Sequence, residues 1–194
     1  TSSPLLISGG WDLSTESQTG FTWFRQMHGT FANRYGFGLY SFNKAYISVS
    51  NIGFLRYNYG INLSNTNHNV ISDIVANSNT SGVYLSGSSN NKLSNIVTNN
   101  NTNNGIYSTS TSGNNAFSDI VTNSNGYYGV NLANSINSTF GNVVANNNNV
   151  VFIYINNSIA TINTLSTNKT ITEFPANDYA NGRISINNVN GGGA

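Results

Sequence analysis

A phrase of 22 to 24 residues recurs along the chain, and this repeat constrains the fold more than any other feature. Its core word is SDIVAN at Ser72, SNIVTN at Ser94, SDIVTN at Ser118 and GNVVAN at Gly141. A second word keeps the same phase, as GINL at Gly60, GVYL at Gly82, GIYS at Gly105 and GVNL at Gly129. With fainter flanking copies, six units cover residues 38–172. Such a period predicts a solenoid in which each unit packs against its two neighbours.

The residue types inside the unit argue against a helical repeat. The segments between apolar positions consist mainly of Asn, Gly and Ser, which are poor helix formers. Short runs of Val, Ile, Tyr and Thr bounded by such residues are typical of strands and turns. Each unit offers three runs, such as GVYL, NKLS and DIVTN, and three short strands joined by tight turns make one coil of a parallel β-helix. Successive coils then lie about 4.8 Å apart, so equivalent residues form columns along the axis.

Three columns of apolar side chains are expected to fill the interior of this helix. They are Ile74, Ile96, Ile120 and Val143; Val83, Ile106 and Val130 with Leu85 and Leu132; and Ile71, Leu93, Phe117 and Phe140. A column of asparagines, Asn77, Asn99, Asn123 and Asn146, falls at a repeated corner. Asparagine tolerates the left-handed backbone of a sharp corner, and its amide can bond the main chain or the asparagine of the next coil.

The repeat resembles the right-handed parallel β-helix family that includes pectate-lyase-like and periplasmic copper-maturation proteins. The resemblance covers the six units and is carried by SNNKLSNIVTNNNTNNGIYS and its neighbours, with Asn at the turns and a Gly-aliphatic-x-aliphatic word opening each coil. It implies an all-β, right-handed parallel β-helix of about six coils. Family members include polysaccharide lyases, hydrolases, epimerases, phage spikes, adhesins and structural parts, so the resemblance implies an architecture and leaves the function open.

Composition narrows the class of protein. Charged residues are 7% of the chain and the formal net charge is +1, which argues against nucleic-acid binding. The chain contains no cysteine, which excludes disulfides and thiolate metal sites, and we predict no metal and no cofactor. No apolar run approaches the roughly 18 residues of a membrane span. Because the chain begins at Thr1 and its one methionine is Met27, we expect a processed chain that is secreted, extracellular or on the cell surface.

Both ends of the chain depart from the repeat, and a solenoid needs a cap at each end. Residues 1–37 are dense in aromatic residues and are expected to form an N-terminal cap on the coils of residues 38–172. The remaining segment, residues 173–194, contains the strand-like run GRISINNV. We expect this segment either to cap its own last coil or to pair with a strand of a neighbouring subunit.

Candidate catalytic groups are few. Asp73 and Asp119 occupy equivalent positions two coils, or about 10 Å, apart, near the upper end of the carboxylate separation in inverting glycosidases. Asn95 and Asn142 alternate with them, so a column of Asx turns is the competing interpretation, and it favours a protein that is not an enzyme. His68, in the turn sequence NTNHN, is interpreted as a solvated turn residue.

One outward column suits sugar binding, because tyrosine rings stack on sugar faces and amides bond sugar hydroxyls. This column is expected to contain Tyr40, Asn62, Tyr84, Tyr107, Asn131 and Ile153. Ordinary sheet-surface composition also explains it, since half of the column is not aromatic. A threonine column would instead indicate ice binding, and the candidate is Ala76, Thr98, Thr122 and Ala145. The irregular step of 22 to 24 residues argues against that function.

A second outward column is apolar. Because Ile96 and Val97 point to opposite faces of a regular strand, Val75, Val97, Val121 and Val144 form an exposed valine strip unless a bulge turns both inward. Exposed strips of this kind mark contacts with other proteins, here side by side between subunits. Six sequons, which support a secreted protein, place possible N-glycans on Asn62, Asn79, Asn100, Asn137, Asn156 and Asn168.

Two classes of function follow from these features. The first is a non-catalytic secreted structural or surface protein, a subunit of a filament, sheath, adhesin or surface layer that associates with itself or with other surface proteins. The scarcity of catalytic groups and the valine strip favour it. The second is a carbohydrate-binding or carbohydrate-active β-helix that uses the Tyr/Asn column or the Asp73 and Asp119 pair.

Overall fold

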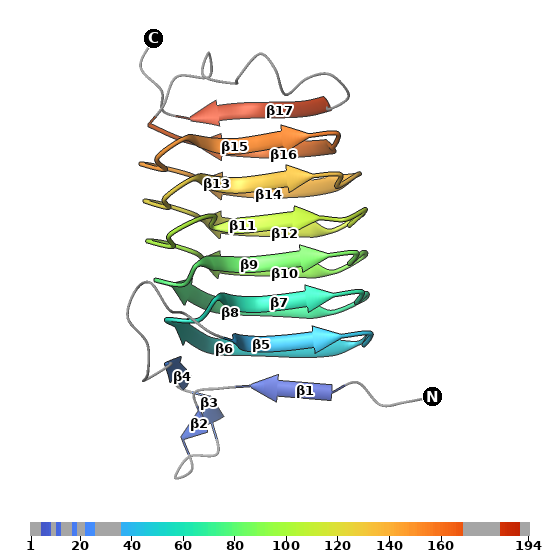
Figure 1. Cartoon of the computed structure of the whole chain (residues 1–194), viewed down its shortest axis with the longest axis vertical. Helices are drawn as coiled ribbons and strands as arrows, with labels where there is room; N and C mark the ends of the chain where they lie inside the picture. The colour runs from blue at the N-terminus through green and yellow to red at the C-terminus, as the bar shows by residue number, and fades with distance from the viewer. Residues whose placement is uncertain are drawn as a thin grey trace.

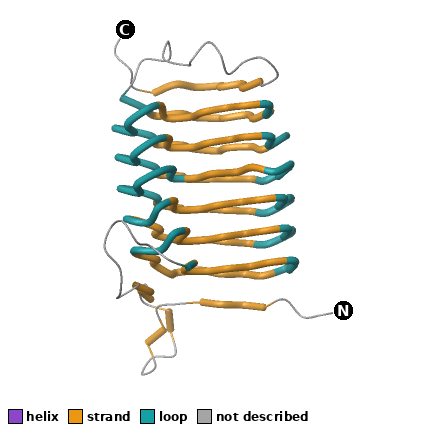
Figure 2. Tube along the Cα trace, in the orientation of Figure 1, coloured by secondary structure: helices purple, strands orange, loops and turns teal. Residues whose placement is uncertain are grey.

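Stacked strands form almost all of the computed structural model, which describes residues 5–8, 11–12, 17–18, 22–25, 36–168 and 183–190. Each coil places one strand in each of two parallel sheets (Figure 1) and returns through loops along the two long edges of the stack (Figure 2). The described residues contain no helix, and thus none that is long and apolar enough to cross a membrane.

The smaller sheet takes one strand from each of six coils. These strands are β5 (Phe37–Phe42), β7 (Tyr59–Ser64), β9 (Ser81–Ser86), β11 (Ile106–Thr109), β13 (Tyr128–Ala133) and β15 (Val151–Asn156). The larger sheet takes the other strand of each coil: β6 (Ile47–Leu55), β8 (Val70–Asn77), β10 (Lys92–Val97), β12 (Ala116–Val121), β14 (Ser138–Val144) and β16 (Ile159–Ser166). The strands pair in parallel with the register of the sequence repeat, so that Ile96 lies between Ile74 and Ile120.

The predicted right-handed parallel β-helix of about six coils is confirmed. The division of each coil into three strands is wrong, because the residues KLS and NIV belong to one strand, β10, of the larger sheet. Within these strands Asp73, Asn95 and Asp119 adopt left-handed φ angles of 53°, 51° and 54°. A residue in this conformation kinks a strand, and here the kink recurs at the same place in successive coils. The turn expected between the second and third runs of each unit is therefore a bend within one strand of the larger sheet.

The kink decides which side chains face the core. On regular alternation Leu93 and Ile96 would point to opposite faces, yet they are 1% and 0% exposed. The left-handed Asn95 leaves two outward residues between them, so Ile96 returns to the interior and Val97 stays outside. All three predicted apolar columns are buried, and the alternative in which a bulge also turns Val97 inward is wrong.

Two columns of buried asparagine were not predicted. They are Asn79, Asn101, Asn125 and Asn148 on one long edge, and Asn69, Asn91 and Asn115 on the other. Asn101 Oδ1 accepts a hydrogen bond from the backbone N–H of Asn79 at 2.8 Å, and Asn101 Nδ2 donates to Asn125 Oδ1 at 3.0 Å. Each amide thus satisfies polar groups of the coils on both sides. In the predicted outward column the Asn99 N–H donates to Asn77 Oδ1 at 2.7 Å, as expected for an amide that bonds the main chain. The left-handed backbone expected at these asparagines is wrong, because the positive φ falls on the next residue, as at Ser78 and Asn100.

Strands from outside the repeat extend the larger sheet at both ends. β1 (Leu5–Ser8) and β4 (Thr22–Arg25) pair with successive halves of β6 and so share one rung. The antiparallel pair β2 (Trp11–Asp12) and β3 (Ser17–Gln18) lies between them in the sequence. At the other end β17 (Arg183–Asn190) pairs in parallel with β16 of its own chain, which favours the first of the two expectations for this segment.

Two aromatic side chains of the N-terminal segment pack on the first coil. Phe24 stacks on Phe54 with ring centroids 6.0 Å apart, and the Trp23 ring lies where a Cβ on Gly53 would be. This placement agrees with a cap of aromatic rings. The other aromatic side chains of residues 1–35 lie outside the described residues, and the boundaries at residues 37 and 172 stay predictions.

Replacing Asn101 by Ala should lower the free energy of unfolding by about 1–3 kcal/mol, because the buried N–H of Asn79 loses its acceptor. Asn103→Ala is the matched control in the same coil, since Asn103 is exposed, and should change stability by no more than about 0.5 kcal/mol. Urea unfolding followed by circular dichroism measures both variants. Equal stability of the two would contradict a structural role for the buried column.

Candidate binding face

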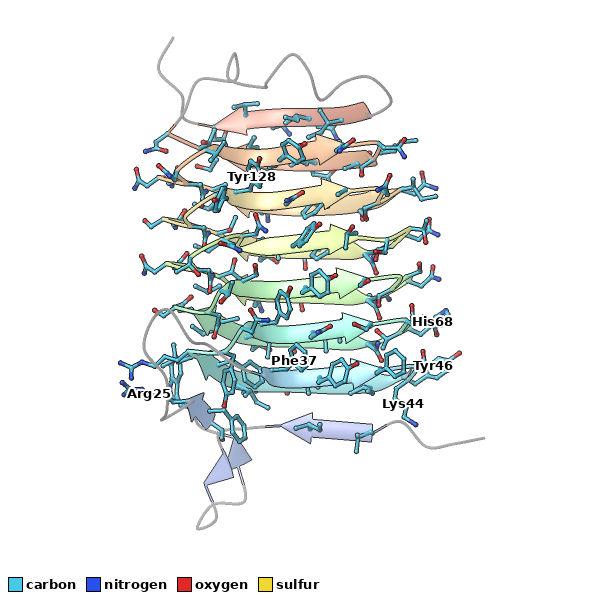
Figure 3. The ribbon with its side chains drawn as sticks, in the orientation of Figure 1. Arg25, Phe37, Lys44, Tyr46, His68 and Tyr128 are labelled. Carbon is cyan, nitrogen blue, oxygen red and sulfur yellow. The ribbon has the colours of Figure 1, made fainter. Side chains whose placement is uncertain are left out.

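The outer surface of the smaller sheet, which we call the aromatic face, carries most of the described tyrosines. Its members are Phe37, Tyr40, Phe42, Tyr59, Tyr84, Tyr107, Tyr128 and Tyr154, together with Asn62, Asn104 and Asn131. The word Gly-aliphatic-x-aliphatic creates this face, because its two aliphatic residues point into the core and the residue between them points out. Figure 3 labels Phe37 in the first coil and Tyr128 in the fifth.

One column of this face differs from the prediction in its last place. The sheet aligns Tyr40, Asn62, Tyr84, Tyr107, Asn131 and Tyr154. Ile153 was expected in the last position, and this is wrong, because Ile153 pairs with Val130 and is 1% exposed. Val151 pairs with Tyr128, which shifts the register by one residue and brings Tyr154 to the surface. Four of the six places in the column are therefore aromatic.

In the first five coils, a second column of the aromatic face is formed by the residue directly before the repeated glycine. Phe37, Tyr59 and Ser81 are in register, and so are Tyr128 and Val151. Extending the β11–β13 register from Ile106↔Val130 by two residues places Asn104 beside Tyr128. This column was not predicted, although an aromatic residue directly before the glycine of YGIN and YGVN marks two of its places.

The rings of the two columns stack on one another along the axis. Phe37 and Tyr59 are stacked with ring centroids 5.9 Å apart, and Tyr59 and Tyr84 are stacked at 4.6 Å. The rings of Tyr84 and Tyr107 lie 5.4 Å apart and are tilted by 53°. A separate pair, Tyr128 and Tyr154, stacks at 4.7 Å. The aromatic face therefore consists of a longer block of rings and a shorter one.

Two amides lie between the blocks of rings. Asn104 precedes β11, and Asn131 pairs with Tyr107 of that strand. Both Oδ1 atoms are buried and accept no hydrogen bond from the described residues. A buried acceptor without a donor costs about 1–3 kcal/mol. Both oxygens are shielded from solvent, so a ligand on the surface does not reach them, and the two residues mark the gap between the blocks of rings.

The aromatic face is uncharged. Its members include no Asp, Glu, Lys, Arg or His. Burial raises the pKa of the Tyr59 hydroxyl, and the neighbouring hydroxyls of Tyr84 and Tyr107 raise it further. Tyr59 therefore stays protonated, and able to donate a hydrogen bond, to higher pH than an isolated tyrosine. Uncharged rings and amides together suit a ligand rich in hydroxyl groups.

The two candidate catalytic carboxylates lie on the other sheet, in β8 and β12. Asn95 Nδ2 donates to Asp73 Oδ1 at 3.0 Å, and Asn142 Nδ2 donates to Asp119 Oδ1 at 2.8 Å. The coil of Asn95 separates the two carboxylates, so the structure does not bring them together. This geometry supports the interpretation of Asp and Asn as alternatives at one kink. Catalysis by Asp73 or Asp119 stays a prediction.

Burial separates the six predicted glycosylation sites into two groups. Asn62 and Asn79 are 5% and 0% exposed, and Asn79 Nδ2 donates to the Phe54 carbonyl at 3.1 Å. The folded protein has no room for a glycan on either amide. The exposed sites, where the prediction stands, are Asn100, Asn137, Asn156 and Asn168.

The remaining predicted columns lie on opposite sides of the larger sheet. Ala76, Thr98, Thr122 and Ala145 are all buried, with exposures of 0% or 1%, so the ice-binding surface considered for them is wrong. Val75, Val97, Val121 and Val144 are in register, point outward and are half-buried. The valine strip is therefore a feature of the surface.

These observations define the class of protein as a right-handed parallel β-helix with an uncharged aromatic face. The chain belongs to the family of the periplasmic copper-binding protein (NosD), whose family model matches residues 19–191. No curated protein sequence matches the chain.

Two solved structures share the architecture. The pectate lyase Pel9A superposes with a TM-score of 0.63 over 98% of this chain and 62% of the lyase, at 14% sequence identity. The enzymatically active domain of tailspike protein 2 from bacteriophage CBA120 has a TM-score of 0.59 over 77% of this chain and 24% of that domain, at 16% identity. The chain thus spans less than two thirds of either protein. At these identities the similarity shows the fold alone.

The family description names copper, and the described residues do not fit a copper site. They include no cysteine and no group of three or more His, Cys, Asp or Glu side chains that could hold a metal ion. Copper in proteins favours imidazole, thiolate and thioether ligands. Among the described residues His68 is the one histidine, and its Nδ1 lies 2.9 Å from Asn67 Oδ1. Met27 and His28 lie outside the described residues.

The kink at Asp119 gives a test that separates backbone conformation from carboxylate chemistry. Asp119→Asn should leave the urea midpoint unchanged, because Asn95 holds the same left-handed conformation one coil earlier. Asp119→Val should lower the free energy of unfolding by about 1–2 kcal/mol, because a β-branched residue is strained at this φ. A loss of stability in Asp119→Asn as large as in Asp119→Val would show that the kink needs the carboxylate.

Proposed function

We propose that this protein is an extracytoplasmic carbohydrate-binding β-helix that holds a linear polysaccharide along its aromatic face. The observation that carries the proposal is the arrangement of two blocks of aromatic rings on one uncharged face, with the half-buried side chain of Asn131 between them. Aromatic rings pack on the apolar faces of sugars, and amides bond sugar hydroxyls. Both kinds of group are present on one surface without a charged side chain.

The spacing of the coils supports binding parallel to the helix axis. Each coil advances by about 4.8 Å, and a pyranose in an extended polysaccharide advances by a similar length. Successive sugars can therefore meet successive coils, first at Tyr59, Tyr84 and Tyr107 and then at Tyr128 and Tyr154. A linear chain that lies along the stack contacts both blocks of rings, whereas a small sugar contacts one.

The comparisons support the same proposal. One structural neighbour is named a pectate lyase, and the other is the enzymatically active domain of a phage tailspike. The family is described as periplasmic, which supports a place outside the cytoplasm. Secretion to the cell surface, as expected from the sequence, stays part of the proposal.

Replacing Tyr84 and Tyr107 together by Ala should weaken polysaccharide binding at least tenfold, a loss of about 1.4 kcal/mol. Affinity electrophoresis in gels that contain a panel of soluble plant and bacterial polysaccharides measures this. Thr161→Ala, on the outer face of the larger sheet, is the control and should migrate as the unaltered protein does. The proposal fails if no polysaccharide retards the protein, or if the control weakens retardation as much as the tyrosine variant.

The valine strip supports a second candidate function, side-by-side association of two copies of this chain. An apolar column that repeats once per coil is complementary to an identical column. Trp23 packs over Gly53 at the end of the same column, so an aromatic ring already lies on this line of the surface. A net charge of +1 gives little repulsion between copies.

Changing Val97 and Val121 to Asp should abolish self-association, because two charges would be desolvated in the contact. Size-exclusion chromatography with light scattering over a range of concentrations measures the mass. Asn163→Asp adds a negative charge elsewhere on the same sheet and should leave association intact, since Asn163 is exposed and outside the strip. A monomer of 20.8 kDa at every concentration of the unaltered protein would exclude this function.

A further inference from the structure

At one corner between the two sheets, the residue at the equivalent position of the first two coils differs in type from that in the later coils. The bridges Ala45↔Asn67↔Ser89 and Gly113↔Ile136 fix the alignment of this corner. The next residue in each coil is left-handed: Tyr46 (φ 59°), His68 (φ 55°), Asn90 (φ 56°), Asn114 (φ 53°) and Asn137 (φ 53°). Asparagine fills three of the five positions, as expected for this conformation, and Tyr46 and His68 fill the other two.

Tyr46 is the sterically costly member of this column. Asn and His are enriched at positive φ, whereas a bulky aromatic residue is an outlier there. Backbone conformations of this kind persist where the surrounding structure enforces them, and they cluster at ligand-binding sites. The column shows that asparagine would satisfy the backbone at position 46. The backbone conformation of the corner therefore does not explain why a tyrosine occupies position 46.

The two rings form one wall of a hollow. Tyr46 stacks on His68 with ring centroids 5.3 Å apart and an angle of 20° between the ring planes, and 56% of Tyr46 is exposed. A hollow of about 210 Å³ lies against them and is also lined by Asn69, Val70, Asn90 and Lys92. Figure 3 labels Tyr46 and His68 on one edge of the stack, with Lys44 below them. The hollow has room for one sugar ring.

The charge around this hollow is positive. Lys92 lines it and also lines a second hollow of about 390 Å³ on the outer face of the larger sheet. Neither hollow has Asp or Glu among its lining residues. The exposed Asn90 and the hydroxyl of Tyr46 add neutral hydrogen-bond donors. An ammonium group beside neutral donors, without a carboxylate to pair with it, favours an anionic ligand.

We propose that Tyr46, His68 and Lys92 form a subsite for an acidic sugar, with Lys92 Nζ pairing with the sugar carboxylate. The stacked rings supply an apolar wall for the sugar ring, and Asn90 and the Tyr46 hydroxyl bond the sugar hydroxyls. This subsite lies on the corner of the larger sheet, separate from the uncharged aromatic face. The subsite discriminates between charged and neutral sugars, whereas the aromatic face does not. Binding at the subsite does not depend on polysaccharide binding to the aromatic face.

Titration of the ¹⁵N-labelled protein with galacturonate, followed by NMR, tests the subsite directly. The backbone amide signals of Tyr46, His68, Asn90 and Lys92 should shift together. Galactose, the uncharged sugar with the same ring hydroxyls, should bind at least tenfold more weakly. Lys92→Gln should remove the difference between the two sugars. Arg56→Gln removes a positive charge outside both hollows and should preserve the difference.

Tyr46→Asn tests the role of the ring. Because asparagine occupies the same left-handed position in three later coils, this variant should be at least as stable as the unaltered protein and should bind galacturonate at least tenfold more weakly. Lower stability with unchanged binding would show that the ring is structural and would overturn its assignment. Equal or absent responses to galacturonate and galactose, or an unchanged response in Lys92→Gln, would overturn the subsite. None of these results depends on Tyr84 or Tyr107, so the proposal for the aromatic face fails or stands separately.

Discussion

Main-chain pairing between successive coils is the constraint on which the rest of this structure depends. Because each strand pairs with its equivalent in the next coil, every side chain has its counterpart about 4.8 Å away. The residue types that fill the columns are those that tolerate such a neighbour. An amide both donates and accepts, so Asn101 can bond Asn79 and Asn125 at the same time. Phe117 and Phe140 stack at 4.6 Å. A column of like charges would repel itself, which agrees with the low content of charged residues, 7%.

The repeat made the architecture and the apolar core predictable, because Ile96 recurs with Ile74 and Ile120 in phase with a strand-forming word. The number of strands in a coil was not predictable, since Asp and Asn suit both a turn that ends a strand and a left-handed kink within one. Only the φ of Asn95 distinguishes the two. The buried amide columns escaped prediction because asparagine is usually a surface residue. Asn79, inside a sequon, is fully buried.

The candidate surfaces were predictable to different degrees. Tyr84 and Tyr107 follow from strand alternation alone. Tyr59 and Tyr128 begin their strands two residues before the buried Ile61 and Val130, so regular alternation would have directed them into the core. The pair Tyr46 and His68 is visible in the sequence only after the structure aligns it with Asn90. In a protein whose equivalent residues form columns, the residue type that recurs in a column is the one that suits the backbone conformation at that position. A departure from it, such as Tyr46, therefore indicates a ligand more strongly than the repeated residues do.

The central functional claim is that sugars bind in step with coils. The most direct measurement is the affinity for a homologous series of linear oligosaccharides, from a disaccharide upward, by isothermal titration calorimetry with a polysaccharide type that the protein binds. Binding along the axis predicts that affinity rises with each added sugar until the chain spans the aromatic face of the six coils, and then levels off. An affinity that is already maximal for the disaccharide would contradict the claim, because such a ligand touches only one block of rings.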